Sequence, residues 1–170
     1  IDPDVGVTRF REYQELSSGI ANFTTRETQS IHADAFASML QASISSTEGF
    51  GNALDNVTLD SGRIFPDTSL ARQLREVSKV VNLDTTSGSR TERAAFFVSE
   101  GGFDTHGTMD ISSLMLELNG GLAAFTAEMK DQGLWDNVTV VIASEFGRTL
   151  SSNSQGSDHG WGGGLFCAWR

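Results

Sequence analysis

The chain has 170 residues, of which 12 are Lys or Arg and 22 are Asp or Glu, so its formal net charge is −10. This acidity argues against nucleic acid as a partner, because a polyanion would be repelled, and a hydrophobic share of 38% argues against wholesale disorder. The one cysteine cannot close an intrachain disulfide, and no apolar run approaches the roughly 20 residues that a membrane span requires.

The first half of the chain has the pattern of helices and connecting segments. Within residues 25–45, apolar residues recur every three or four positions, which predicts an amphipathic helix with its Phe and Met residues in the core. The mixture of Gly, Asn, Asp and Ser in residues 49–62 predicts a loop. A second helix is expected to begin after Pro66, with Asp67 as its N-cap.

The second half predicts strands as well as helices. Residues 94–99 and 138–143 are short apolar runs, typical of strands that are covered on both faces. Between them a helical repeat begins at Asp110, which can cap it, and ends at Gly133. The order strand, helix, strand favours a parallel pair of strands joined by a right-handed crossover. We therefore expect an α/β fold.

The two ends of the sequence lead us to expect a fragment of a longer protein. Ile1 is not an initiator Met, and residues 165–170 form a last apolar run, a predicted strand, that simply stops.

Three loops rich in glycine hold side chains that suit a metal ion. Asp104 and His106 follow the first predicted strand, Glu145 follows the second, and Asp158 and His159 stand in a third loop. The loops after neighbouring parallel strands meet at one edge of an open sheet, where ligands bind. If residues 104–106 are extended, the first and third side chains point the same way. We predict that the ion is bound by Asp104, His106, Glu145 and His159.

Carboxylates combined with imidazoles suit zinc, manganese or iron better than calcium, which prefers oxygen alone. We expect a divalent ion, with zinc as the first choice and manganese, iron and calcium as alternatives. Asp158 and Thr105 are expected to lie beside the ligands and orient them. Arg148 is the predicted catalytic residue, since its guanidinium could hold an anionic ester oxygen by paired hydrogen bonds.

Other interpretations of these residues stand beside the metal site. Asp104 and Asp158 could simply shape turns, Glu145 and Arg148 could simply pair with each other, and the histidines could simply bond to loops. The spacing of the residues alone supports these structural roles and metal binding about equally. A serine hydrolase is less well supported, because residues 143–147 lack the first Gly of a nucleophile elbow. No Gly-rich segment ends in Gly-Lys-Ser or Gly-Lys-Thr, as a P-loop requires. His32, in the first predicted helix, is expected to be a packed or solvated residue.

Several motifs in order resemble a known family. They are GGFDTH at residues 101–106, SEFGRT at 144–149 and DHGWGG at 158–163, preceded by the helix start FPDTSLARQL at 65–74. This combination resembles the mostly bacterial family called domain of unknown function 1501, which is grouped with alkaline phosphatases and sulfatases. The resemblance covers residues 64–164. It implies a doubly wound, mainly parallel sheet, of which residues 64–170 would be the C-terminal part and residues 1–63 a helical and loop segment of the same domain.

The resemblance also implies an activity and a location. The expected protein is an exported, metal-dependent hydrolase of phosphate or sulfate esters, found in the periplasm or secreted, with an anionic ester as its substrate. Asp104 and His106 resemble one set of superfamily ligands, Glu145 stands where a further Asp ligand would be, and His159 resembles a late His ligand. Phe146 stands in the place of another His ligand, so one ligand of a two-metal centre is missing.

The nucleophile of the superfamily lies near the beginning of the domain, and the resemblance assigns that role to no residue of this chain. The nucleophile is therefore unknown, and the fragment is expected to catalyse little by itself. The rival hypothesis is a non-catalytic secreted or surface-associated binding protein that kept the fold.

Overall fold

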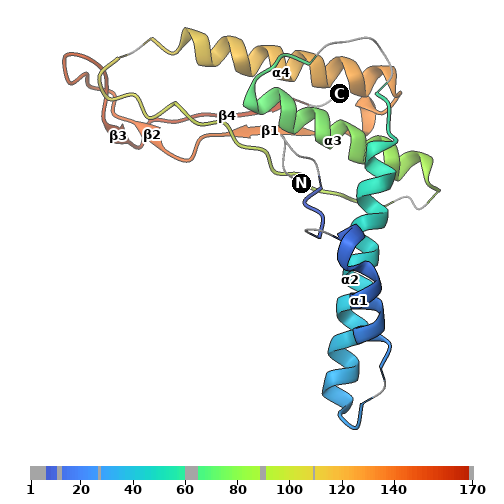
Figure 1. Ribbon diagram of the computed structural model, residues 1–170. Coiled ribbons are helices and arrows are strands. Elements are labelled where there is room, and N and C mark those ends of the chain that lie inside the picture. Colours follow the sequence, from blue (N-terminus) through green and yellow to red (C-terminus); the bar gives the residue numbers. More distant parts are fainter. Residues whose placement is uncertain are drawn as a thin grey trace.

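The computed structural model describes residues 7–10, 13–26, 28–59, 65–88, 91–108 and 110–168. Across these residues the chain forms four α-helices, one 3₁₀ helix and four short strands, so helices and strands are combined as expected of an α/β protein. Figure 1 shows three parts: a helical hairpin, a pair of packed helices, and a long set of strands and loops beside that pair.

Helices α1 (Tyr13–Thr24) and α2 (Ile31–Asp55) form the hairpin, which projects away from the other elements (Figure 1). The predicted helix over residues 25–45 is confirmed in its central part, and Ser30 caps it by accepting a hydrogen bond from the amide of Ala33. The loop predicted for residues 49–62 is wrong as far as residue 55, because α2 continues; residues 60–62 lie outside the described residues.

Gly51 accounts for part of this difference, because its lack of a side chain makes room for another segment. A Cβ atom there would lie 2.9 Å from Nε of Arg9, whose guanidinium forms an ion pair with Asp55. The glycine is therefore a packing position inside the helix and does not mark its end.

The Phe and Met stripe of α2 is not core, contrary to the expectation. Phe36 is 64% exposed and Met39 is 70% exposed, while the buried residues of α2 are Ala37, Ile44, Gly51 and Leu54.

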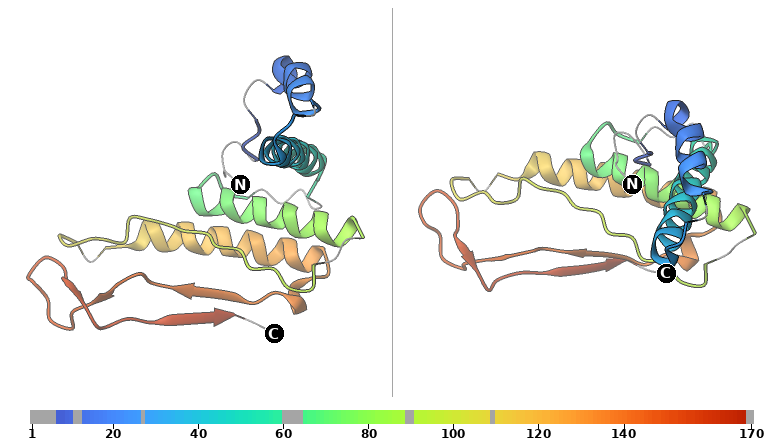
Figure 2. Two further views of the ribbon diagram at one scale, coloured as in Figure 1. Left: turned by 90° about the horizontal axis from the view of Figure 1, so that it is seen from below. Right: turned by 60° about the horizontal axis from the view of Figure 1, so that its bottom comes forward.

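Helices α3 (Ser69–Thr86) and α4 (Ser112–Asp131) lie side by side and hold the main hydrophobic core (Figure 2). Its buried members are Leu70, Leu74, Phe125 and Met129. Within the described ranges, no helix is both long enough and apolar enough to cross a membrane.

The ends of these two helices are fixed by local hydrogen bonds. Thr68 caps α3, in place of the predicted Asp67, which lies one residue too early and instead pairs with Arg72 at 2.7 Å. Asp110 accepts a hydrogen bond from the amide of Ser112 at the start of α4, as expected of a capping carboxylate.

The predicted end of α4 at Gly133 is confirmed. Gly133 has a φ of 70°, and its amide and that of Leu134 bond back to the carbonyls of Lys130 and Met129. This Schellman arrangement satisfies the last carbonyls of the helix. It turns the chain through the 3₁₀ helix η1 (Trp135–Asn137) into the strands.

All strand pairings in the described residues are antiparallel. Strand β1 (Val140–Ala143) pairs with β4 (Leu165–Ala168), and β2 (Gly147–Arg148) pairs with β3 (His159–Gly160). The strands predicted near residues 138–143 and 165–170 are thus present, although residues 169 and 170 lie outside the described ranges. The predicted parallel pairing of residues 94–99 with 138–143 is not formed.

Residues 94–99 are instead part of an extended segment without strand pairing, residues 91–99. Side chains of α3 hold it at both ends. The backbone amide of Thr91 donates to the carboxylate of Asp84 at 3.0 Å. The side-chain amide of Gln73 donates to the carbonyl of Ser99 at 2.8 Å and accepts from the backbone amide of Ser99 at 3.0 Å. These bonds tie the segment to α3 and leave it apart from β1.

Candidate metal site

One loop and one short strand bring Asp104, His106 and His159 together. Oδ1 of Asp104 lies 2.8 Å from Nε2 of His159 and 2.9 Å from Nε2 of His106. The ligand atoms of the three residues all lie within 4.8 Å of one another, and each side chain is about half exposed. The structure thus gathers three of the four predicted ligands into one possible metal-binding group, hereafter the His–Asp cluster.

His106 is held between two carboxylates. Its Nε2 faces Asp104, and its Nδ1 lies 3.3 Å from Oδ1 of Asp158. When Nδ1 carries a proton and donates it to Asp158, a neutral ring has Nε2 free to bind an ion. Asn153 supports this arrangement by donating to Asp158 at 3.0 Å and to the carbonyl of His106 at 3.3 Å.

The two aspartates of the site have lowered pKa values. The pKa of Asp104 is lowered, first by the hydrogen bond with His159 and also by electrostatic interactions with His106, His159 and Arg148, while desolvation opposes the change. The pKa of Asp158 is lowered by hydrogen bonds from His106 and Asn153. Two ionised carboxylates beside two imidazoles make an environment that attracts a cation.

Phe146 fixes the ring of His159 by stacking. The two ring centroids are 4.2 Å apart and the planes differ by 17°, and the guanidinium carbon of Arg148 lies 4.9 Å from the Phe146 centroid. Phe146 therefore contacts the ring of His159 and limits its rotation.

Arg148 joins the two loops that carry the cluster. Its Nη1 donates to the carbonyl of Ser157 at 2.6 Å and its Nη2 to the carbonyl of Phe103 at 2.7 Å. These carbonyls adjoin the segments of His159 and Asp104, so the guanidinium sets the spacing between them. Its predicted contact with an ester oxygen would use the remaining N–H donors and stays a prediction.

Two glycines allow the backbones of the site to approach closely. A Cβ atom on Gly156 would lie 2.6 Å from the carbonyl oxygen of His106, and one on Gly147 would lie 2.5 Å from the carbonyl oxygen of Gly160. Any larger residue would push these segments apart. Gly147 and Gly156 are therefore required by contacts between distant parts of the chain.

Two predicted residues lie outside the cluster. Glu145 is exposed and does not join the group of ligand atoms within 4.8 Å; the next residue, Phe146, is the one that faces His159. The Thr105 side chain forms no hydrogen bond within the described residues, and its amide donates to the carbonyl of Phe103 at 2.9 Å.

Sequence reasoning missed Asn153 and the stacking role of Phe146. Asn153 also accepts hydrogen bonds at Oδ1 from the amides of Gln155 and Gly156, so it shapes the loop that delivers Asp158. The Ser, Asn and Gly residues at 151–156 predict a turn, but the contact of Asn153 with Asp158 depends on how the loop folds back.

The donor atoms fit a small divalent ion after a limited movement. A tetrahedral zinc ion with bonds of about 2.0–2.1 Å would separate its ligand atoms by roughly 3.3 Å. The present distances of 2.8 and 2.9 Å from Asp104 to the two histidines would have to lengthen by about half an ångström. Exposed side chains in loops can move this far, and binding would require that the imidazole nitrogens facing Asp104 carry no proton.

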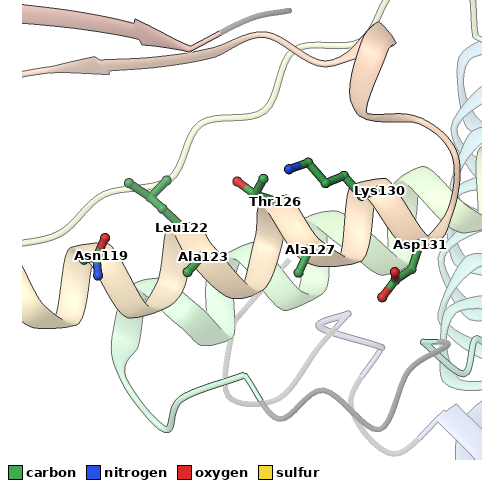
Figure 3. A pocket seen from close by; sticks show the side chains of 7 residues that line it. All are labelled: Asn119, Leu122, Ala123, Thr126, Ala127, Lys130 and Asp131. Carbon is green, nitrogen blue, oxygen red and sulfur yellow. The ribbon is translucent and has the colours of Figure 1, made fainter.

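A pocket beside helix α4 holds no comparable group of metal-binding side chains. It has a volume of about 550 Å³ and runs along α4, which supplies all of its lining residues (Figure 3). These are Asn119, Leu122, Ala123, Thr126, Ala127, Lys130 and Asp131. No group of ligand atoms converges there, so the His–Asp cluster is the better candidate for a functional site.

Comparison with known proteins identifies a family and gives no activity. A family model described as "Protein of unknown function (DUF1501)" matches residues 83–169, about half of the chain. The matched range includes every residue of the His–Asp cluster. No curated protein and no solved structure matches the chain.

Proposed function

The chain belongs to the DUF1501 family of proteins of unknown function, and from this premise we propose that it is part of a metal-dependent hydrolase of phosphate or sulfate esters. The supporting observation is that one carboxylate oxygen and two imidazole nitrogens converge within 4.8 Å in an exposed position. Structural zinc sites have four protein ligands, whereas catalytic sites keep three and leave a position open. Three exposed ligands therefore suit catalysis better than a purely structural role.

Each residue of the site has a definite part in this proposal. Asp104, His106 and His159 would hold the ion, which would neutralise charge that develops on the ester oxygens. Asp158, which lies 3.3 Å from Nδ1 of His106, would hold the proton on that nitrogen and leave Nε2 available as a ligand. Arg148 keeps the two loops at the right separation and, with its remaining donors, would bind an ester oxygen.

The identity of the metal follows from the donor set. Two imidazoles and one carboxylate suit zinc, and the same set with open positions is also found with ferrous iron. Manganese is a further alternative, and calcium should bind most weakly because it prefers oxygen ligands. We place zinc first.

Three further parts of the proposal come from the resemblance to alkaline phosphatases and sulfatases. The natural protein would have the doubly wound, mainly parallel sheet of that superfamily, would be exported, and would take its nucleophile from polypeptide outside these 170 residues. The antiparallel pairing of β1 with β4 is a departure that this fold would have to accommodate.

Metal titration tests the site directly. Isothermal titration of the 170-residue chain with zinc, manganese, ferrous iron and calcium should give one site, tightest for zinc. His106→Ala and His159→Ala should each weaken zinc binding at least tenfold. His32→Ala is the matched control, because this exposed histidine lies in α2, away from the cluster. Unchanged zinc affinity in the double variant of His106 and His159 would refute the site.

Turnover separates the enzyme from its rival. The complete natural protein loaded with zinc should hydrolyse 4-nitrophenyl phosphate or 4-nitrophenyl sulfate and lose that activity in His159→Ala. The rival, a secreted binding protein that kept the fold, is favoured by Phe146, which stacks on His159 in the place of a further ligand. Tight zinc binding without hydrolysis of either ester would support the rival.

A further inference from the structure

Trp161 has a strongly exposed side chain next to the His–Asp cluster. It is 85% exposed, although tryptophan is highly buried on average. It stands two residues after His159, so the Cα atoms of these two residues are at most about 7 Å apart. Among the described residues, both aromatic contacts at the cluster involve His159 and neither involves Trp161. The indole ring therefore meets solvent beside a proposed metal ligand.

The residues around Trp161 leave its ring uncovered. Residues 160–164 read Gly-Trp-Gly-Gly-Gly, so the indole is the one side chain of this stretch. A Cβ atom on Gly162 would lie 2.6 Å from the carbonyl oxygen of Arg148, so at least this glycine is required by the close approach of two backbones. Strands β2 and β3 lie at the end of the molecule away from the helical hairpin (Figure 1).

Hydrogen bonds hold the backbone on both sides of Trp161. The amide of Arg148 donates to the carbonyl of Gly162 at 2.6 Å, and the amide of Gly162 donates to the carbonyl of Arg148 at 2.9 Å. Before the tryptophan, the carbonyl of Asp158 accepts from the amide of Thr149 at 2.9 Å. An indole has only two rotatable side-chain bonds, so a ring on a fixed backbone loses little freedom when it contacts a ligand.

Leu150 adds a second exposed apolar side chain to this surface. It is 79% exposed and stands two residues after Arg148. Its side chain reaches the residue that follows Trp161, because a Cβ atom on Gly162 would lie 3.4 Å from Cδ2 of Leu150. Ligand sites combine apolar surface with a few polar groups that fix orientation. Here the His–Asp cluster would supply the polar part.

Polar side chains of the adjoining loop are already engaged with the loop itself. Ser152 donates to the carbonyl of Gly156 at 3.0 Å, and Asn153 donates to Asp158 at 3.0 Å. Recognition of a sugar would need free donors and acceptors for its hydroxyl groups. The exposed surface beside the cluster is instead offered by an indole and a leucine, which suits a flat apolar group.

We propose that Trp161, with Leu150 in the adjoining segment, selects esters whose organic group is an aromatic ring, by stacking on that ring. The inference rests on the proposed function, because the bound ion would hold the ester oxygens and so fix the ring near the indole. Stacked and edge-to-face aromatic pairs are favourable beyond the area that they bury. Trp161 would determine specificity and would not be catalytic, since the reacting atoms would lie at the ion.

The test measures the binding of two phosphonates, which are not hydrolysed, to the complete natural protein loaded with zinc. Phenylphosphonate has the ring and methylphosphonate lacks it, and both present a phosphonate group to the ion. Isothermal titration should show phenylphosphonate bound about tenfold more tightly. Trp161→Ala should reduce this preference to about twofold or less, and Trp161→Phe should restore most of it, because a smaller ring can still stack.

Two further variants sharpen the comparison. Phe97→Ala is the matched control, because it removes a ring that is 92% exposed and lies outside the cluster; the preference should stay unchanged. Leu150→Ala should weaken phenylphosphonate binding by about threefold, less than the loss of the indole, since it removes a smaller apolar surface. Zinc affinity and circular dichroism, measured for each variant, check that the metal site and the helices are intact.

Proton–nitrogen NMR tests the contact directly. The indole N–H signal that is missing from the spectrum of Trp161→Phe belongs to Trp161. This signal should shift when phenylphosphonate is added and stay in place with methylphosphonate, because only phenylphosphonate brings a second ring to the indole.

The inference and the proposed function fail in different ways. A protein that binds no zinc, or that binds neither phosphonate when loaded with zinc, would refute the proposed function and this inference with it. Zinc-dependent binding of both phosphonates with equal affinity, or a preference that survives Trp161→Ala, would overturn the inference alone. So would a lower melting temperature of Trp161→Ala with an unchanged preference, which would show that polypeptide outside the 170 residues covers the indole.

Discussion

The α3–α4 pair and the His–Asp cluster are held together by different forces. In the helix pair, Leu70, Leu74, Phe125 and Met129 are almost fully buried against one another. The cluster has half-exposed side chains, and its loops are joined by hydrogen bonds from Arg148 to backbone carbonyls and by close contacts at glycines. Stability should therefore depend on the helices and chemistry on the loops, so that each can be damaged without the other.

The largest expected effect is on the helix pair. Met129→Ala removes a side chain that is 0% exposed and should lower the free energy of unfolding by about 2–5 kcal/mol. Chemical denaturation followed by circular dichroism measures this. Met115→Ala is the control on the same helix, since Met115 is 48% exposed and the change should stay within about 0.5 kcal/mol. Equal losses in both variants would show that α4 is packed differently.

Gly147→Ala should damage the cluster and leave the helices intact. The added Cβ would meet the carbonyl oxygens of Gly160 and Gly162 at 2.5 and 2.7 Å, so β2 and β3 must separate and carry His159 away from Asp104. We expect zinc affinity to fall by more than tenfold with unchanged helical circular dichroism. Gly101→Ala, where a Cβ meets nothing within 4 Å, should bind zinc normally.

Arg148→Lys tests whether shape or charge matters at this position. A lysine keeps the charge but has a single nitrogen, which cannot reach the carbonyls of Phe103 and Ser157 together. Since residues that orient metal ligands commonly contribute 10–100-fold to affinity, zinc binding should weaken by about tenfold. Arg75→Lys is the control, since the partly exposed Arg75 pairs with Glu76 and lies outside the cluster. Wild-type affinity in Arg148→Lys would contradict the joining role of the guanidinium.

Phe146→Leu should have a smaller effect. The stacking interaction that holds the ring of His159 contributes about 0.5–1.5 kcal/mol, and its loss corresponds to about two- to tenfold weaker zinc binding. Phe97→Leu changes an exposed Phe outside the cluster and should have no effect. If Phe146→Leu binds zinc as well as the wild type does, the stack does not position the ligand.

The smallest effect is a titration without metal. Because the hydrogen bond from His159 is the main cause of the lowered pKa of Asp104, His159→Ala should raise that pKa toward the ordinary value of 3.8. A lowered folded-state pKa stabilises the fold above the ordinary value, and this contribution disappears as the pH falls through the folded-state pKa. Carboxyl carbon NMR during an acid titration measures the change. An Asp104 pKa that is the same in both proteins would contradict the 2.8 Å contact.

Short-range patterns predicted much of the second half of the chain. The start of α4 near Asp110, its end at Gly133 and the strand near residues 138–143 follow from capping, glycine conformation and apolar runs, which act within a few residues. The same reasoning predicted that Asp104 and His106, which follow an apolar run, and His159, which stands in a glycine-flanked loop, would be ligands.

Pairing and packing were decided by contacts between distant residues. Nothing near residues 94–99 reveals that Gln73 and Asp84 fix this segment to α3, so its parallel pairing was wrongly predicted. The composition of residues 49–62 predicted a loop, whereas Gly51 lies inside α2 and leaves room for the side chain of Arg9. Glu145 and Phe146 are equally placed along the chain, and only the loop's path puts Phe146 against His159.

The sequence by itself determined which residues could bind a metal and where most helices begin and end, since capping and periodicity are local properties. Only the tertiary structure decided which of those residues meet, which edges of the strands stay unpaired and what Arg148 holds. Those outcomes depend on chain segments about 25 to 55 residues apart, whose approach is set by packing and hydrogen bonds that no local pattern encodes.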